Sequence, residues 1–424
     1  MSGAPKLLVS DKKGNISIHP KLEAAGMKAG HFFRLHGRDL VKLPAGSRLF
    51  MLPSRLPVGH NSQANSFVAV DGFFAVAAFV RPGFTVTHSP SYSEYNSPKP
   101  LPIFSYAALA FYKGELYTTA VMVDKDRRHD QRFTDIDLVR VNAEKFKKLF
   151  ARNRLIAHLK SCALTYGCPN AQNFFLSKFE APLPVSPSCN ARCSGCISFQ
   201  SANRKLCASQ PRIKFTPTPE ELGEIALFHI KNVKDPILSF GQGCEGEPLL
   251  EGGIIDKAIK IIRKRSVKGI ININTNGSAT KVLARLFDSG LDSVRISLNS
   301  AQAFYYNRYY KPIKYKFSDV ASSIRLASVK SKFVSLNYLT MPGFTDSMEE
   351  FSALVRLIER DRPDMIQWRN LNYDPLLYFR QLQLWPERSK LLGIEEVISR
   401  LRKVYPKLMM GYFNPALSKI RKLI

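Results

Sequence analysis

The stretch SCNARCSGC, at residues 188–196, decides how the rest of the sequence is interpreted. Its cysteines, Cys189, Cys193 and Cys196, have the spacing C-x3-C-x2-C, so three thiolates on one short loop can converge on a single metal centre. A structural zinc ion takes four ligands, and a [4Fe–4S] cluster has four irons to ligate. Three local cysteines therefore leave either a distant fourth ligand or one iron open to another molecule. A zinc knuckle completed by a remote cysteine or histidine stays open as the structural alternative.

Strand-like and helix-like segments alternate from about residue 181 onward. The predicted strands are 184–188, 236–241, 270–275, 293–299, 333–340 and 364–371. The predicted helices between them are 220–230, 254–265, 279–287, 318–327 and 348–360. This alternation implies right-handed βαβ crossovers and a parallel sheet. Six strands, with the cysteine loop after the first, predict a partial β/α barrel whose chemistry lies at the C-terminal ends of its strands.

The residues outside the barrel have a different character. Residues 1–134 are expected to form a β-rich α+β N-terminal domain, because apolar runs flank turn signals such as Lys13-Gly14-Asn15. Residues 135–180 have helical spacing and are expected to form a connector. The barrel is assigned to residues 181–375 and a basic helical extension to residues 376–424. No catalytic motif precedes the barrel, so the N-terminal domain is expected to serve in docking.

Three further motifs follow successive predicted strands. They are Gly246-Glu247-Pro248 after the second strand, Asn276 within Thr275-Asn276-Gly277 after the third, and Ser297-Leu298-Asn299 at the end of the fourth. Strand alternation predicts that the side chains of Ser297 and Asn299 share one face. Each motif alone could also be a simple turn or an inward-facing polar plug of a barrel. Their order along the chain favours one shared site at the mouth of the barrel.

Together with the cysteine loop, these motifs resemble the radical S-adenosylmethionine (SAM) enzymes over about residues 183–371. The resemblance implies that the three cysteines bind three irons of a [4Fe–4S] cluster and that SAM chelates the fourth. One electron then cleaves SAM, and the resulting radical abstracts hydrogen from a substrate. The residues implied to bind SAM are Gly246, Glu247, Pro248, Asn276, Ser297 and Asn299. The sequence departs from the family pattern at Gly195, Glu245 and Asn299, where the family usually has an aromatic residue, a glycine and an acid.

The last predicted strand carries the candidates for substrate contact and catalysis. Gln367 and Arg369 are expected on one face of this strand, with Trp368 on the other. A buried arginine is rarely left unpaired. Arg369 therefore meets either an anionic group of the substrate or SAM, or a carboxylate in a structural ion pair, and the sequence leaves both open.

Four cysteines remain outside the loop, namely Cys162, Cys168, Cys207 and Cys244. Four is the number of ligands that a second [4Fe–4S] cluster takes, and all four are expected near the barrel mouth. An auxiliary iron–sulfur cluster or a zinc site is one interpretation. The other is ordinary buried cysteine, which packs as a small hydrophobic residue. No cysteine follows Cys244, so the chain lacks the cysteine-rich extension of the peptide-modifying members of the family.

Composition and charge limit the kinds of partner and the location that can be expected for the chain. The net charge is +28, which indicates a polyanionic partner such as RNA or a phosphorylated substrate, or simply lysine-rich solvated faces. No apolar run reaches the length of a membrane span, and the first residues lack the apolar stretch of a signal peptide. An odd number of clustered cysteines is unlike a secreted disulfide framework, so a cytoplasmic location is expected.

The sequence thus predicts a radical SAM enzyme of nucleic-acid modification or cofactor biosynthesis. The resemblance also implies an electron donor, either a small reductase or a protein of the flavodoxin or ferredoxin type. The alternative is a zinc-stabilised RNA-binding protein in which the cysteines are purely structural.

Overall fold

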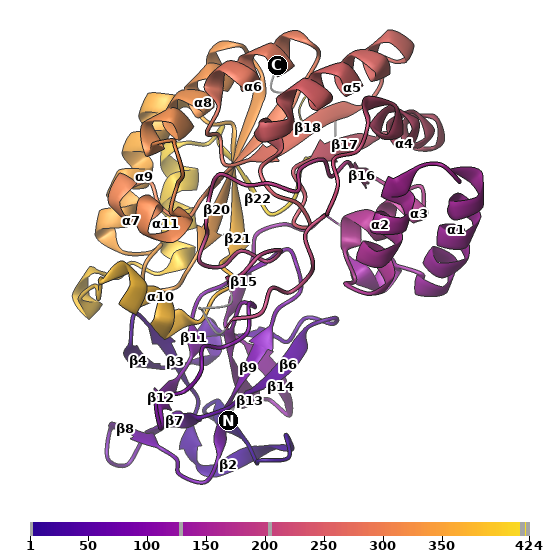
Figure 1. Cartoon of the computed structure of the whole chain (residues 1–424). Coiled ribbons are helices and arrows are strands. Elements are labelled where there is room, and N and C mark those ends of the chain that lie inside the picture. The colour runs from indigo at the N-terminus through magenta and orange to yellow at the C-terminus, as the bar shows by residue number, and fades with distance from the viewer. Residues whose placement is uncertain (1–2, 127–129, 202–205, 416–419, 421–424) are drawn as a thin grey trace.

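The computed structural model describes residues 3–126, 130–201, 206–415 and 420. Figure 1 shows a β-rich N-terminal part, a group of three helices beside it, and a larger part in which helices surround a sheet. None of the helices in the described part combines the length and the apolar character that a membrane crossing requires.

The larger part is built on a seven-stranded parallel sheet whose strands follow chain order. The strands are β16 (Glu180–Pro182), β17 (Ile237–Phe240), β18 (Ile270–Thr275), β19 (Ser293–Leu298), β20 (Phe333–Thr340), β21 (Met365–Asn370) and β22 (Met409–Gly411). Every residue of β17 and β18 is buried, as expected for a parallel sheet covered by helices. The predicted α/β class with a partial barrel is confirmed.

Helices connect these strands. They are α4 (Pro219–Asn232), the short η5 (Pro248–Glu251), α5 (Gly252–Arg265), α6 (Thr280–Asp288), α7 (Ala303–Tyr310), α8 (Phe317–Val329), α9 (Met348–Asp361), α10 (Pro375–Leu382), η6 (Arg388–Lys390) and α11 (Ile394–Val404). Helix α4 begins where the sequence predicts, because the Thr218 hydroxyl accepts from the Glu221 N–H in a capping box. Helix α7 was not predicted, whereas α10 and α11 lie in the predicted helical extension.

The first and last strands differ from the prediction. The first strand is β16 and not 184–188, because the N–H groups of Val185 and Ser186 donate to the Glu245 carboxylate, at 2.8 and 3.0 Å, instead of continuing the ladder. A seventh strand, β22, lies in the predicted C-terminal extension and pairs with β21. Three residues are too few for a recognisable pattern. Residues 416–419 and 421–424 of that extension lie outside the described residues.

The N-terminal part contains a ten-stranded antiparallel sheet with two smaller sheets of two and three strands. Its strands are β1 (Lys6–Ser10), β2 (Ile16–Glu23), β3 (Ala25–Lys28), β4 (His31–Arg34), β5 (Val41–Lys42), β6 (Arg48–Leu52), β7 (Arg55–Asn61), β8 (Ser66–Ala69), β9 (Phe74–Phe79), β10 (Phe84–Val86), β11 (Ser89–Pro90), β12 (Tyr92–Glu94), β13 (Ala107–Tyr112), β14 (Glu115–Thr118) and β15 (Ala120–Met122). Short helical turns lie at η1 (Gly37–Asp39) and η3 (Gln131–Phe133).

The three-helix group consists of α1 (Ile136–Leu149), α2 (Arg154–Leu164) and α3 (Pro169–Phe175). Helix α1 begins after Asp135, whose carboxylate accepts from the Leu138 N–H. Phe146 packs on Phe228 of α4 with ring centroids 4.9 Å apart. This aromatic contact holds the helical group against the barrel.

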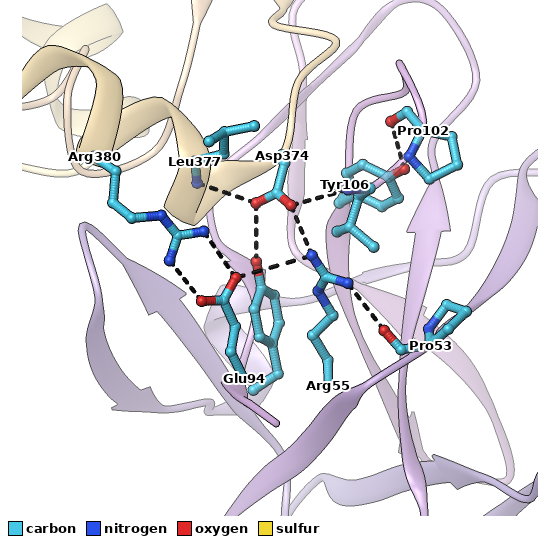
Figure 2. A network of polar contacts seen from close by, with 10 residues as sticks. Pro53, Arg55, Glu94, Pro102, Tyr106, Asp374, Leu377 and Arg380 are labelled. Carbon is cyan, nitrogen blue, oxygen red and sulfur yellow. Dashed lines mark hydrogen bonds and ion pairs between the residues drawn. The ribbon is translucent and has the colours of Figure 1, made fainter. Parts of the chain in front are cut away.

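The N-terminal part is fixed to the barrel by a buried ion pair, shown in Figure 2. Arg55 of β7 lies 2.9 Å from the carboxylate of Asp374, and both side chains are almost fully enclosed. Asp374 also caps α10 by accepting from the Leu377 N–H. Beside this pair, Arg380 donates to Glu94 at 2.5 and 2.9 Å. The Arg55–Asp374 pair is therefore an ion pair between the two parts that water does not solvate.

A second contact joins β10 to the end of β21. The Asn370 amide accepts from the Val86 N–H at 2.8 Å and donates to the Phe84 carbonyl at 2.9 Å. Thr85 also donates its hydroxyl to the Trp368 carbonyl. Because Asn370 offers an acceptor and a donor as a neighbouring strand does, it satisfies the backbone of β10 without a further strand.

Candidate active site

The cysteine loop and the Gly246-Glu247 motif approach each other through their backbones. The Gly246 N–H donates to the Ser186 carbonyl at 2.7 Å, and the Glu247 N–H donates to the Ser188 carbonyl at 2.8 Å. A Cβ atom at position 246 would lie 1.9 Å from the Ser188 carbonyl oxygen. Only glycine therefore permits this approach, which sets the start of the loop that carries Cys189.

Two buried carboxylates accept hydrogen bonds from the backbone around the cysteine loop and the Gly246-Glu247 motif. Glu245 accepts from the N–H groups of Val185, Ser186 and Gln242. Glu247 accepts from the Leu249 and Asn276 N–H groups, at 3.0 and 2.8 Å, and from the Thr275 hydroxyl. Burial raises the pKa of each glutamate to about 7. These hydrogen bonds of Glu247 all join parts of the protein, so this residue ties the end of β18 to the motif that follows β17.

The three loop cysteines are half-buried and influence one another. Burial raises the pKa of Cys189 to about 11, and burial followed by the Cys196 and Cys189 thiols raises the pKa of Cys193. Arg212 lies 3.6 Å from the Cys196 sulfur. Three neighbouring thiols on one loop form a donor set that fits an iron–sulfur cluster, because bound iron would replace their protons and balance the charge of the three thiolates. No sequence pattern singles out Arg212.

The position before the third cysteine has no room for a side chain. A Cβ atom at Gly195 would lie 2.7 Å from the Tyr309 hydroxyl and 2.8 Å from the Asn372 carbonyl oxygen. Tyr309 is a buried residue of α7, and its own carbonyl accepts from the Ser194 N–H at 3.0 Å. An aromatic side chain thus reaches this region from α7, which the sequence analysis did not identify.

The other residues implied for SAM lie in different surroundings. Asn276 donates to the Asn190 side chain at 2.8 Å and so contacts the cysteine loop. Ser297 accepts from Asn337 at 3.0 Å. Asn299 lies one residue past the end of β19, is fully buried, and donates to the Tyr378 hydroxyl and the Tyr305 carbonyl. Pro248 is buried at the first position of η5.

The interior also contains polar atoms without a partner among the described residues. They are the Asn299 Oδ1, the Asn337 Oδ1 and the Arg295 Nε, each buried. Unpartnered buried polar atoms are rare in native proteins and call for a ligand, an ion or water. These atoms therefore fit a barrel interior that receives a polar molecule.

Gln367 and Arg369 share a face with Arg295. Gln367 is fully buried, accepts from Arg295 at 3.2 Å, and donates to the Asn414 side chain at 3.2 Å. Arg369 donates to the Tyr412 carbonyl at 3.1 Å and stacks on the Tyr412 ring, 4.4 Å from its centroid. Among the described residues, neither arginine has a carboxylate oxygen within the 4.0 Å of an ion pair. The structural ion pair considered for Arg369 is thus not formed within the described chain.

A cavity of about 370 Å³ opens where the N-terminal part, the helical group and the barrel meet. Arg48, Arg81, Arg295 and Arg369 line it, and Glu180 is the one acidic residue among its described lining. Burial, followed by the charge of Arg369, lowers the pKa of Arg295 to about 9. A positive pair that is costly to keep charged in the interior becomes favourable when an anion binds between its members.

The remaining cysteines separate into a group and an outlier. Cys162 and Cys244 are buried beside His158, and Cys168 interacts electrostatically with both cysteines. Cys207 is exposed. The structure therefore does not bring the four cysteines together as one set of ligands for a second cluster, and it adds a histidine that the sequence analysis did not consider.

Residues 183–357 match the family model of the Radical SAM superfamily. The chain thus contains a radical SAM domain, as the sequence motifs implied. Radical SAM proteins are enzymes that use a [4Fe–4S] cluster and SAM and need an electron donor, so this class and these two cofactors follow from the match. The match favours this interpretation over a purely structural role for the cysteines.

Two curated relatives share part of the chain. "Molybdenum cofactor biosynthesis protein 1" of Mus musculus is 26% identical over 231 residues, which are 49% of this chain and 33% of the relative. "Probable GTP 3',8-cyclase" of Methanococcus aeolicus is 27% identical over 189 residues, which are 42% of this chain and 58% of the relative. The chain spans 33% of the length of the first relative and 58% of the length of the second.

Solved structures with a similar fold include methylornithine synthase and HydG, a maturase of the [FeFe]-hydrogenase. Methylornithine synthase is 15% identical with a TM-score of 0.37, covering 65% of this chain and 74% of that one. HydG is 13% identical with a TM-score of 0.39, covering 66% of this chain and 64% of that one.

Proposed function

We propose that this protein is a radical SAM enzyme whose substrate is a small anionic molecule of the phosphorylated class, bound in the cavity between the barrel and the N-terminal part. The observation that carries the proposal is the pair Arg295 and Arg369, which line the cavity without a carboxylate partner among the described residues. Arginine binds phosphate and carboxylate oxygens through its planar fork of donors.

The names of the relatives suggest the first compound to test. One relative is named a probable GTP 3',8-cyclase and the other a molybdenum cofactor biosynthesis protein. A purine nucleoside triphosphate carries the negative charge that four lining arginines favour. We therefore infer a role in cofactor biosynthesis, with GTP as the first candidate substrate.

The site residues take the following roles in this proposal. Cys189, Cys193 and Cys196 hold the cluster, while Gly246, Glu247, Pro248, Asn276, Ser297 and Asn299 shape the place for SAM. When bound, the cluster and SAM supply the radical chemistry that removes hydrogen from a substrate. Arg369 and Arg295 bind the anionic group of the substrate. Gln367 contacts Arg295 and not the cavity, so it is a positioning residue. The electron comes from a small reductase, flavodoxin or ferredoxin.

A nucleic-acid substrate is the second candidate, because the chain has a net charge of +28. RNA binding through several phosphates falls steeply with salt, whereas a small anion in an enclosed cavity makes fewer such contacts. Binding of a labelled single-stranded RNA and of GTP at two salt concentrations separates the two candidates.

The test uses the reconstituted enzyme with SAM and a chemical reductant under anaerobic conditions. We expect 5′-deoxyadenosine to form and its rate to rise when GTP is added. In Arg369→Gln, losing one charge-assisted contact of about 1.5–3 kcal/mol should weaken GTP binding about 10- to 100-fold. Arg402→Gln is the matched control, because Arg402 is exposed on α11. Equal GTP affinity in both variants and the parent would contradict the proposal.

A further inference from the structure

A second set of metal-binding side chains lies outside the cysteine loop. The ligand atoms of His158, Cys162 and Cys244 all lie within 4.8 Å of one another. The His158 Nε2 is 3.2 Å from the Cys244 sulfur and 3.6 Å from the Cys162 sulfur. Both cysteines are buried, at 3% and 4% exposure.

These distances discriminate between a single ion and a cluster. A zinc ion about 2.1 Å from nitrogen and about 2.3 Å from sulfur places tetrahedral N and S ligand atoms about 3.6 Å apart. Cysteine sulfurs on different irons of a [4Fe–4S] cluster lie at separate corners and therefore further apart. The observed spacing fits one ion, and the mixture of imidazole and thiolate ligands suits zinc.

We propose that His158, Cys162 and Cys244 bind one Zn²⁺ ion whose fourth coordination position opens toward the cavity. His158 and Cys162 lie one helical turn apart on α2, so they project from the same face of that helix. Cys244 follows β17 in the barrel. The ion joins the helical group to the barrel.

The open coordination position of the zinc site faces the cavity that is proposed to bind the substrate. Cys162 and Cys244 line the same cavity as Arg295 and Arg369. Cys168 also lines it but stays outside the group of three among the described residues. Three protein ligands with one open position are typical of catalytic zinc sites, in which water or substrate completes the tetrahedron. The ion thus faces the place where an anionic substrate binds.

The experiment measures zinc in the full chain with Cys189, Cys193 and Cys196 changed to alanine, so that no iron binds at the loop. We expect about one zinc per chain after exposure to zinc sulfate and dialysis. Adding Cys162→Ser and Cys244→Ser should abolish it, whereas Cys207→Ser, at an exposed cysteine, should not. Zinc that survives the double substitution, or iron in place of zinc, would overturn the proposal.

Cobalt keeps the test valid if the double variant does not fold. Co²⁺ added to the cluster-free chain should give the visible and near-ultraviolet absorption of a tetrahedral site with thiolate ligands. Folded protein without that absorption would refute the site. Cys168→Ser should retain the zinc, and its loss would show that Cys168 closes the fourth position. These readouts need neither SAM cleavage nor GTP, so they stand if the proposed function fails.

Discussion

At the scale of single residues, Gly246 is a position in the site that leaves no room for a side chain. Gly246→Ala would put a methyl group 1.9 Å from the Ser188 carbonyl oxygen, so the backbone next to Cys189 must move. We expect a loss of about 3 kcal/mol in the free energy of unfolding and a reconstituted enzyme that retains little iron. Urea unfolding and iron per chain measure the two effects.

Gly253→Ala is the matched control, because a Cβ atom there meets nothing within 4 Å and lies in the first turn of α5. This change should stabilise the chain by about 0.5–1 kcal/mol. Iron retention by Gly246→Ala equal to that of the control would show that the loop tolerates the displacement.

Residue motifs were the most predictable part of the site. The cysteine loop, Gly246-Glu247 and Asn276 come together because parallel strands end at one edge of a sheet. Arg212, Tyr309 and His158 were not predictable, since each reaches the site from a segment whose placement depends on tertiary packing. Single polar or aromatic residues carry no spacing signal of their own.

At the scale of elements, the contact between β7 and α10 depends on Arg55 and Asp374. Asp374→Asn keeps a helix cap but removes the nearer carboxylate of the buried Arg55, which is then left with Glu94 at 3.9 Å. We expect this change to cost about 3–5 kcal/mol in the free energy of unfolding.

The control is Asp137→Asn, which breaks an ion pair with Arg140 whose side chains are 83% and 63% exposed. Exposed pairs contribute at most about 1 kcal/mol. Urea unfolding of both variants checks the difference. Similar losses in the two would mean that water reaches the Arg55 pair.

The elements also show where the sequence pattern fails. Helix α4 and strands β18 and β20 were predictable because caps and continuous apolar runs mark them. Strand β22 was not, because three residues form no periodic pattern and its pairing with β21 is set by the fold. The cavity could not be predicted from the sequence either, because it forms only where the N-terminal part, the helical group and the barrel meet.

At the scale of the whole molecule, the buried His229 contributes to the response to acid. Burial lowers the pKa of His229 to about 4, below its ordinary value of 6.5. Between these values the unfolded chain binds a proton that the folded chain excludes. The contribution of His229 to stability is therefore complete above about pH 6.5 and falls as the pH drops toward 4.

We expect His229→Gln, which cannot titrate, to reduce the loss of stability between pH 7 and pH 4.5 by about 2 kcal/mol. Urea unfolding at both pH values gives the difference. The same substitution at His36, whose side chain is 50% exposed, is the control. An unchanged acid response in His229→Gln would show that other groups dominate it.

The cavity lined by four arginines takes its walls from three separate regions of the chain. In the proposed function the radical chemistry takes place in the barrel, but the shape and charge of the cavity also depend on Arg48 and Arg81 in the N-terminal part. Substrate choice can therefore diverge between homologous enzymes through changes in that part alone. A chimera that carries another enzyme's N-terminal sheet would exchange selectivity while leaving the reactive centre untouched.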